Sequence, residues 1–595
     1  MNTKIESYRL LQSIVAGAER VISSKQELNK INIFPVADGD TGSNLSSLMQ
    51  SIIDSISTDN MSIKQLLNQI SDAALIGARG NSGVIFAQYL NAVSENYQVG
   101  EENLERLIES FGKAVSSAYS ALLEPKEGTI LSVMRTWSET LVTNHKNGLS
   151  FENSLLHAKN KAYDAVIATQ FQMVILKKNK LVDSGAKGFY YFIEGFTDFY
   201  CGIINNAKLI VTTTNNNEDI PQQHKILEKP VHRYCSEFII KELKILEVEL
   251  KNILSEKGDS LVLAGNQKKL KIHIHTNQPH KILTVLEKYG TITYQKIDDM
   301  ALQYEISQNK KSSIAIVTDS VADFPKELIL TEQIHVLPMN IAINDQYFLD
   351  KLTINSEVIQ AKSTPDVKMN TSQPSIQTVD ALFSFLEGKY DHVIVITVSS
   401  KLSGTYQLIS QRIKAKDLSD KWIHLFDSKL NSVAQGLLVK QATQLVDKGL
   451  PFEKIVEEIK KISERIFIYV AVKDLTPMIR SGRVPKHLGK MAQKFSLHPI
   501  VSLDKEGRGK LIGASFSQRK SMTKIMKKIT ALSRHSKLEE IAITHVLSND
   551  DVLWCEDFLS KKLGEHFYIS DSSSAIAIAA GAGSVAIAGI LKENI

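Results

Sequence analysis

The sequence has few cysteines and no N-terminal apolar stretch of the kind that directs secretion. Only three cysteines occur among its 595 residues, and Cys201, Cys235 and Cys555 lie far apart. This spacing excludes a disulfide framework and favours a reducing compartment. The first residues, MNTKIESYRL, do not resemble a signal peptide. We therefore expect a cytoplasmic protein.

A large net charge and long runs of bulky apolar residues are also absent. The formal net charge of +5 is small for this length and Lys and Arg form no dense block, so we expect no nucleic-acid partner. The uncharged segment 572–591 is long enough to cross a bilayer. Because it consists mostly of Ala, Gly and Ser, we interpret it as a buried strand, loop and helix. We expect no transmembrane segment and only transient contact with a membrane.

The chain is too long for one hydrophobic core, and its composition (43% hydrophobic, 23% charged) is ordinary for a globular protein. Apolar residues recur at helical spacing through the first 200 residues. Polar stretches at 212–223 and 307–313 are typical of linkers. The expected domains are residues 1–206, 224–306 and 312–595.

The last domain is marked by short apolar runs rich in β-branched residues. They lie at 313–320, 392–400, 466–472 and 540–546. Runs that are apolar throughout predict strands covered on both faces, as in a parallel α/β sheet. The region is long enough for two lobes with a cleft between them. The expected fold is thus multidomain: an all-α domain, a small α/β domain and a two-lobed α/β module.

The strongest chemical signal is the segment NKINIFPVADGDTGSNL at 29–45. Asp38 and Asp40 are separated by one glycine, and two carboxylates this close repel each other unless a cation neutralises them. Hard divalent cations prefer carboxylate oxygens. Gly39 and Gly42 permit a tight loop that turns both acids and several backbone N–H groups toward one point. The pattern favours Mg²⁺ holding the phosphates of a nucleotide; the alternative is an ordinary polar turn.

Three further turn-like segments lie in the helical region: GARGNSGV at 77–84, KEGTIL at 126–131 and VDSGA at 182–186. A Gly-rich turn that leads into a helix presents free N–H groups and the positive end of the helix dipole to phosphate. The segment at 77–84 is not a Walker motif, because no G-K-[ST] ends it. Each segment is a weak signal when taken alone.

In this order, the four segments resemble the DhaL/DAK2 kinase domain, in particular that of the bacterial fatty acid kinase catalytic subunit, over residues 1–205. The resemblance implies an eight-helix barrel with ATP at its mouth. It implies that Asp38 and Asp40 are catalytic and hold Mg²⁺, with Asn32 at the position of a third acid in dihydroxyacetone kinases. The nucleotide-contacting positions that it implies are Thr41, Asn44, Gly80, Asn81, Ser82, Thr129, Asp183 and Gly185.

A second polar group consists of Cys235 in HRYCSEF and the pair His273/His275 in LKIHIHTNQP. Alternate residues of a strand share a face, so both imidazoles point the same way. A thiolate with two imidazoles suits zinc, and a fourth position is left for water or a carboxylate. The alternative is a half-buried cysteine with two surface histidines.

The segment around these residues also resembles the middle domain of the fatty acid kinase catalytic subunit, which implies a zinc site at Cys235, His273 and His275 and a homodimer. We expect the zinc to be structural, because nothing in the sequence places it beside the phosphate donor.

The last domain carries hydroxyl-rich loops after its predicted strands, TSQPS at 371–375 and LSGTY at 402–406. Loops at strand ends are where open α/β sheets bind ligands, and these suit an anionic head group. The alternative is ordinary turn chemistry. With IVTDSVADFP at 316–325 and RSGRV at 480–484, the loops match the DegV family in order.

The DegV resemblance covers the whole last domain and implies two α/β lobes with a fatty acid in an apolar tunnel. The fatty-acid-binding positions that it implies are Thr371, Ser372, Ser403 and Gly404. It identifies Arg480 or Arg483 as the catalytic cation near the point of phosphoryl transfer. One departure is Ala579, which stands where the family has a carboxylate-binding histidine. Losing that charge-assisted hydrogen bond would weaken head-group binding by roughly 1.5–3 kcal/mol.

Together these features predict a phosphotransferase, a fatty acid kinase that uses ATP and Mg²⁺ to convert a fatty acid carboxylate to an acyl phosphate. The carboxylate is ionised at neutral pH, so no general base is required. Catalysis would depend on alignment and charge neutralisation. Joining both parts in one chain would raise the effective concentration of the acyl chain at the ATP site. Two alternatives stay open: a kinase for a small hydroxy-ketone such as dihydroxyacetone, and a non-catalytic lipid-binding protein.

Overall fold

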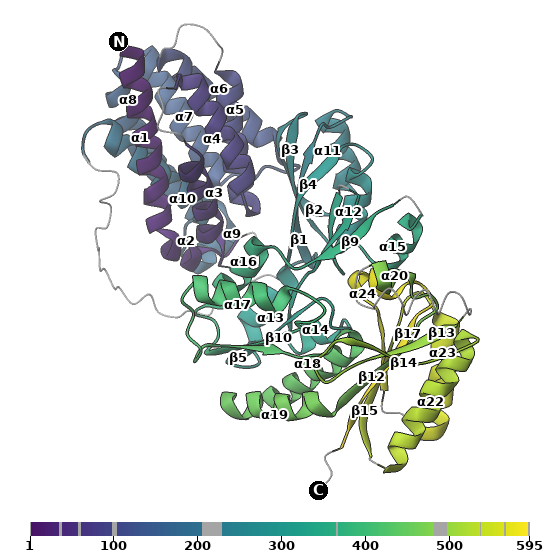
Figure 1. The fold of residues 1–595 in the computed structure, drawn as a ribbon. Helices are drawn as coiled ribbons and strands as arrows, with labels where there is room; N and C mark the ends of the chain where they lie inside the picture. The colour runs from purple at the N-terminus through teal and green to yellow at the C-terminus, as the bar shows by residue number, and fades with distance from the viewer. Residues whose placement is uncertain are drawn as a thin grey trace. The chain divides into compact units, whose positions relative to one another are not determined.

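The computed structural model describes residues 2–34, 39–56, 61–97, 104–204, 229–344, 346–364, 367–480, 497–535, 537–563 and 567–592 (Figure 1). Two compact units divide the chain, Met1–Tyr304 and Glu305–Ile595. The expected linker at 212–223 lies outside the described residues. The one expected at 307–313 is only partly irregular, because helix α13 (Met300–Asn309), which lacks Gly and Pro, covers its first residues.

The first unit begins with a ring of helices. Within the described part of residues 2–204, eight helices have 15 residues or more, whereas α2 and α9 have 7 and 6. The helices are α1 (Asn2–Ser23), α2 (Lys25–Ile31), α3 (Thr41–Ser55), α4 (Ile63–Gly77), α5 (Gly80–Asn96), α6 (Leu104–Ser120), α7 (Ile130–Lys146), α8 (Phe151–Gln172), α9 (Val174–Asn179) and α10 (Ser184–Tyr200). Each long helix packs against the next, and α10 packs against both α8 and α1, so the ring closes. The predicted all-α domain with eight main helices is confirmed.

Regular apolar spacing builds the core of this ring. In α6, Leu107, Phe111, Ala114 and Ala118 recur three or four residues apart and are buried. Such a stripe faces the neighbouring helices because it follows the 3.6-residue period of the helix. The helical domain therefore has one continuous core.

A four-stranded antiparallel sheet follows in the same unit, with strand order β2-β3-β1-β4. Its elements are β1 (Tyr234–Lys241), α11 (Glu247–Ser255), β2 (Asp259–Asn266), β3 (Lys269–Thr276), α12 (Pro279–Leu286) and β4 (Thr291–Asp299). Strands β2 and β3 pack against α5, and Val262 joins the helical core. The backbone N–H of Leu263 donates to the carbonyl of Ala121 at 3.1 Å. The helical ring and this sheet are thus parts of one packed unit.

The register of this sheet brings its polar residues together. Cys235 pairs with His275 and Glu237 pairs with His273 across the antiparallel β1 and β3. Alternate residues of a strand share a face, so all four side chains lie on the same side of the sheet.

The described residues of the second unit form two main sheets. The first has strand order β11-β10-β5-β6 with all neighbours parallel, and the second has order β14-β13-β12-β17-β15-β16. A three-stranded antiparallel sheet, β8-β7-β9, accompanies them. The strands are β5 (Ile314–Asp319), β6 (His335–Leu337), β7 (Asn340–Ile343), β8 (Gln346–Leu349), β9 (Met369–Ser372), β10 (His392–Thr397), β11 (Ile423–Asp427), β12 (Ile466–Ala471), β13 (His498–Leu503), β14 (Gly509–Ser515), β15 (Leu538–His545), β16 (Phe567–Asp571) and β17 (Val585–Leu591).

Helices cover these sheets, which confirms an α/β module. They are α14 (Leu328–Thr331), α15 (Ser356–Lys362), α16 (Ile376–Leu386), α17 (Thr405–Ala415), α18 (Ser432–Asp447), α19 (Phe452–Arg465), α20 (Thr476–Arg480), α22 (Gln518–His535), α23 (Asn549–Leu563) and α24 (Ser574–Ala580). Two groups of helices pack against the six-stranded sheet, α18 with α19 and α22 with α23.

The expectation of a parallel sheet holds for the runs at 313–320 and 392–400, which form β5 and β10. It is wrong for the run at 466–472, because β12 is antiparallel to both β13 and β17. In the same sheet β15 is parallel only to β16. A strand covered by helices on both faces is apolar throughout in either direction, so periodicity does not distinguish the two arrangements.

The uncharged segment 572–591 is buried in the second unit. It forms the helix α24 followed by the strand β17, so the expected helix and strand are present with the helix first. Among the described residues, none of the helices combines the length and the hydropathy needed to cross a bilayer.

Candidate functional site

Four helix N-termini meet at one end of the helical ring. Helices α3, α5, α7 and α10 begin at the four turn-like segments that the sequence singled out. A Cβ at Gly80 would lie 2.6 Å from Nδ2 of Asn44, and one at Gly185 would lie 2.4 Å from Oγ of Ser82. The carboxylate of Asp183 accepts hydrogen bonds from backbone N–H groups of Ala186, Ile130 and Gly185, which joins the third segment to the fourth. Helix N-termini carry positive partial charge and free N–H groups, so this arrangement suits phosphate.

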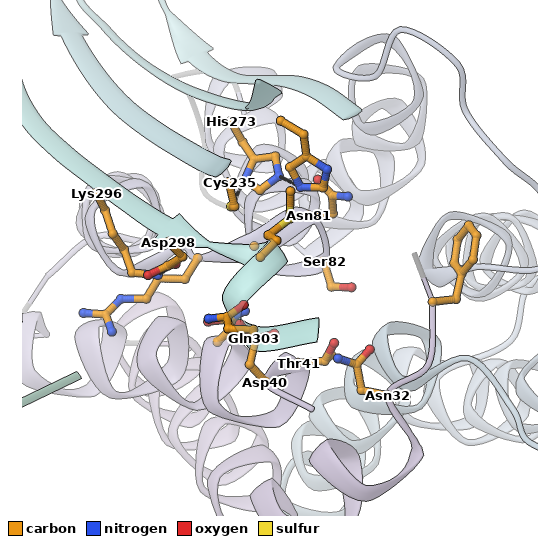
Figure 2. A pocket seen from close by; sticks show the side chains of 16 residues that line it. Asn32, Asp40, Thr41, Asn81, Ser82, Cys235, His273, Lys296, Asp298 and Gln303 are labelled. Carbon is orange, nitrogen blue, oxygen red and sulfur yellow. Dashed lines mark hydrogen bonds and ion pairs between the residues drawn. The ribbon is translucent and has the colours of Figure 1, made fainter. Parts of the chain in front are cut away.

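A pocket lies beside these N-termini, and its lining residues all belong to the first unit (Figure 2). The space in it, counted together with its opening to solvent, is about 550 Å³. Its lining residues are Asn32, Phe34, Asp40, Thr41, Asn44, Arg79, Gly80, Asn81, Ser82, Cys235, His273, His275, Lys296, Asp298, Met300 and Gln303. Figure 2 shows Asp40, Thr41 and Asn32 on one side of it and Cys235 and His273 on the other. The helical ring and the four-stranded sheet therefore share one site.

Hydrogen bonds hold described residues on both sides of the acidic motif. The amide oxygen of Asn29 accepts from the backbone N–H of Ser43 at 3.0 Å, and its Nδ2 donates to Oγ of Ser43 at 3.0 Å. Asn32 is 2% exposed and its Oδ1 accepts from Oγ of Ser184 at 3.3 Å. Asp40 is the residue that precedes α3. Asp38 lies outside the described residues.

Seven of the predicted nucleotide or magnesium positions line the pocket: Asn32, Asp40, Thr41, Asn44, Gly80, Asn81 and Ser82. Thr129, Asp183 and Gly185 are not among its lining residues. Gly185 lies against Ser82, which does line the pocket, and the Asp183 carboxylate caps α10. The hydroxyl of Thr129 donates to the carbonyl of Lys126 at 2.7 Å.

Cys235, His273 and His275 form a cluster whose ligand atoms all lie within 4.8 Å of one another. The two Nε2 atoms of the histidines are 3.2 Å apart. Nδ1 of His275 lies 3.3 Å from a carboxylate oxygen of Asp259, and Nδ1 of His273 lies 3.6 Å from Oε1 of Glu237. Sγ of Cys235 also lies 3.8 Å from Nδ1 of His273. Carboxylates next to the imidazoles are the usual support of zinc-binding histidines. The residues present therefore fit a zinc ion.

Burial, together with the Glu237 carboxylate, raises the pKa of the Cys235 thiol well above its usual value. The thiolate form of Cys235 would therefore be stable only with a cation beside it, because a bound cation lowers the pKa of the thiol.

The position of this cluster corrects one expectation. Nothing in the sequence places it beside the phosphate donor, yet it lines the same pocket as Asp40 and Thr41. The three residues lie on β1 and β3, far from the acidic loop in sequence, and the packing of the sheet on α5 brings them there. The expectation of a purely structural zinc rests on the sequence not placing the cluster near the phosphate donor. That reason does not hold, because the cluster and the acidic segment line the same pocket.

Sequence reasoning missed the cations of this pocket, Arg79 and Lys296. Lys296 is paired with Asp298 on β4, and Asp298 lies opposite Cys235 in the sheet. Burial alone would lower the pKa of Lys296, but Asp298 and Glu237 raise it, so the ammonium keeps its charge. The only signal for Lys296 in the sequence is that one residue separates it from Asp298, which predicts that both side chains lie on one face of a strand.

The predicted fatty-acid positions also come together, in the second unit. Thr371 and Ser372 end strand β9, and Ser403 and Gly404 precede α17. A Cβ at Gly404 would lie 2.6 Å from Oε1 of Gln373, so the two loops touch. The hydroxyl of Ser403 is 2.9 Å from that of Thr405.

Helix α24, which carries the buried Ala579, packs against β9 and α20. Arg480 is the last residue of α20; its side chain, and all of Arg483, lie outside the described residues.

Three protein families match successive parts of the chain. Residues 35–198 match the DAK2 domain. Residues 231–307 match the middle domain of FakA-like fatty acid kinase proteins. Residues 313–592 match the DegV family, described as uncharacterised proteins.

Curated relatives occur in staphylococci. An uncharacterized protein of Staphylococcus epidermidis is 30% identical over 352 residues, which cover 55% of this chain and 64% of that protein. An uncharacterized protein of Staphylococcus aureus is 30% identical over 315 residues, covering 51% of this chain and 57% of that protein. The chain thus spans about three fifths of the length of these relatives.

Solved structures of DegV proteins are similar to the second unit. A fatty acid binding DegV family protein from Streptococcus agalactiae is 25% identical, with a TM-score of 0.43, and covers 47% of this chain and 99% of its own. DegV, a fatty acid binding protein from Bacillus subtilis, is 26% identical with a TM-score of 0.41, and the match covers 47% of this chain and 100% of that protein.

Proposed function

We propose that this chain, a fusion of a DAK2 domain, a FakA-like middle domain and a DegV-family domain, is a fatty acid kinase. It would transfer the γ-phosphoryl group of ATP to the carboxylate of a fatty acid, giving an acyl phosphate and ADP. The observation that carries the proposal is the pocket in which Asp40 and the starts of α3 and α5 face Lys296 and the Cys235 cluster. The pocket offers a carboxylate to bind a metal ion, backbone N–H groups to bind phosphate, and a lysine to stabilise the negative charge of the transferring phosphoryl group.

The helical side of the pocket would bind the nucleotide. Mg²⁺ held by Asp40, with Asp38 beside it in sequence, would neutralise the phosphate charge. Thr41, Asn44 and Ser82 line this side and offer donors to phosphate oxygens. The N-termini of α3 and α5 add their dipoles.

The sheet side of the pocket would receive the reacting groups. Lys296 is held in place by Asp298, and Arg79 lies at the start of α5. Both would stabilise negative charge that spreads over the transferring phosphoryl group. A bound zinc at the Cys235 cluster would supply a further positive charge at this wall. The role expected from the sequence for Arg480 or Arg483 stays a prediction, because the Arg480 side chain and all of Arg483 lie outside the described residues.

The acceptor would be a fatty acid bound by the DegV-family domain. Thr371 lies near the end of strand β9 and Ser403 lies just before α17, and the segment that follows β9 touches Gly404. The hydroxyls of Thr371 and Ser403 would bind the carboxylate head group. The carboxylate is already ionised at neutral pH, so the reaction needs alignment rather than a general base.

A kinase for dihydroxyacetone is the second candidate, because the match to the DAK2 domain by itself allows it. The middle domain and the DegV-family domain favour the fatty acid.

The test is to incubate the purified chain with magnesium, ATP and oleate, and to trap the acyl phosphate with hydroxylamine. Oleoyl hydroxamate should form in proportion to ADP, and dihydroxyacetone in place of oleate should give no dihydroxyacetone phosphate. Phosphorylation of dihydroxyacetone alone would establish the second candidate. Binding of oleate without any turnover of ATP would indicate a lipid-binding protein.

A further inference from the structure

We propose that Glu237 and Lys271 form a buried link between the metal cluster and the turn at the start of α5, so that metal binding and nucleotide binding are energetically coupled. The inference rests on the proposed function, because it treats this turn as part of the nucleotide site. Glu237 and Lys271 do not line the pocket, and we assign them a role in positioning the residues that do.

The two residues extend the row of polar side chains on the sheet. Glu237 lies two residues after Cys235 on β1, and Lys271 lies two residues before His273 on β3. Alternate residues share a face, so both are on the side that carries the metal cluster. The strands β2 and β3 pack against α5 on this side. Glu237 and Lys271 are 1% and 0% exposed, which removes competition from water.

Both side chains bond directly to the turn. Oε1 of Glu237 accepts a hydrogen bond from the backbone N–H of Gly80 at 2.7 Å. Nζ of Lys271 donates to the carbonyl oxygen of Ala78. The two side chains also pair with each other, with Nζ and Oε2 3.2 Å apart. The sheet thus holds the turn at the start of α5 by two hydrogen bonds, one accepted by Glu237 and one donated by Lys271.

The same carboxylate faces the metal cluster. Oε1 of Glu237 lies 3.6 Å from Nδ1 of His273 while it accepts from Gly80. A carboxylate behind a metal-binding imidazole fixes the orientation of the ring. Binding of an ion by His273 therefore fixes the position of Glu237 as well, and with it the N–H of Gly80.

The turn has little freedom to move independently of the pocket. Gly80 has a φ of +60°, in the left-handed region that favours glycine, and its Cα faces the side chain of Asn44. Asn44 and Asn81, the residue that follows Gly80, both line the pocket. A shift of Gly80 would displace both from the positions in which they face a phosphate.

The experiment is titration calorimetry of MgADP binding to the full chain, loaded with zinc or stripped of it. Zinc should tighten MgADP binding by about tenfold, and MgADP should tighten zinc binding by the same factor, because coupling is reciprocal. A Glu237→Met, Lys271→Met double variant removes both charges and both bonds while keeping similar volumes. The coupling factor is the ratio of the MgADP dissociation constants without and with zinc, and in this variant it should fall to about one.

Two controls separate the link from general damage. Asp259→Asn removes the carboxylate behind His275, the ligand that is not joined to the turn, and should weaken zinc binding by roughly 10- to 100-fold while the coupling factor is kept. Arg233→Met, Asp299→Asn removes another ion pair of the same domain, with Nη2 and Oδ2 2.7 Å apart, and should leave the coupling unchanged.

A second measurement avoids the risk that the double variant misfolds. In the unmodified chain, amide exchange at Gly80 should slow when zinc is bound, because its N–H is then held by a fixed carboxylate. Equal MgADP affinity with and without zinc, or full coupling in the folded double variant, would overturn the link but not the kinase. Failure of the unmodified chain to bind MgADP would overturn both.

Discussion

The start of α10 touches the start of α5 at Gly185 and Ser82, where a Cβ at residue 185 would lie 2.4 Å from Oγ of Ser82. The same Cβ would lie 3.2 Å from Oδ2 of Asp183. Ser82 lines the pocket and Gly185 does not. A substitution at Gly185 would therefore act on the pocket by moving the side chain of Ser82.

Gly185→Ala should therefore weaken nucleotide binding. The added methyl group forces Ser82 to rotate away from its position, and overpacking of this kind costs about 1–3 kcal/mol. We expect about a tenfold rise in the dissociation constant of MgADP, measured by calorimetry. Gly83→Ala is the matched control, because a Cβ there meets its nearest neighbours at 3.8 Å. Equal affinities of the two variants would contradict this account of the contact.

Asp183→Asn should remove a pH dependence of stability. Burial raises the pKa of Asp183 to about 6 from 3.8, so the folded state binds a proton more tightly than the unfolded state does. The stabilising contribution is complete below pH 4 and is lost as the pH rises through 6.

Two units of pKa correspond to about 3 kcal/mol. The free energy of unfolding of the parent, minus that of the Asp183→Asn variant, should therefore fall by about this amount between pH 4 and pH 7. Denaturant titrations at several pH values measure it. A constant difference across this range would show that Asp183 does not carry the raised pKa.

Cys235→Ser should abolish stoichiometric zinc. Among the described residues the cluster offers three ligands, and loss of the thiolate leaves two imidazoles. Metal analysis of the purified chain should give one zinc per chain for the parent and less than a tenth of that for the variant. Cys201→Ser is the control, since Cys201 ends the helical ring and is not in the cluster. Full zinc content in Cys235→Ser would place the ion elsewhere.

Ala579→His should strengthen binding of fatty acids. The residue lies on α24, which packs against the strand that carries Thr371, and a charged donor there would bond the head group. We expect about a tenfold fall in the dissociation constant of oleate, as a hydrogen bond to a charged group provides. Ala579→Leu adds bulk without a donor and should not improve binding. Unchanged binding in both variants would mean that the head group lies elsewhere.

The elements that sequence predicts well are those that depend on local patterns. The four turns are recognisable because Gly and Asp have specific backbone and charge roles, and each turn does begin a helix. The His273/His275 pair is recognisable because alternation on a strand is local. The eight main helices follow from the spacing of apolar residues, as α6 shows.

What the sequence could not predict depends on contacts between distant segments. The packing of β3 on α5 places the Cys235 cluster in the pocket, and no spacing in the sequence records that contact. The alternation of Lys296 with Asp298 on one strand predicts a shared face, but it does not predict that Lys296 lies in the pocket. The direction of β12 was also unpredictable, because burial on both faces makes a strand apolar whatever its neighbours' direction.

The most direct test of the kinase proposal is the rate of oleoyl hydroxamate formation by the Asp40→Asn variant, compared with the parent at saturating MgATP and oleate. Asp40 lines the pocket beside Thr41, and its carboxylate is the charge on which magnesium binding depends here. The rate should fall by about a hundredfold or more while the dissociation constant of oleate stays the same. An unchanged rate would contradict the proposal that this pocket is where the phosphoryl group is transferred.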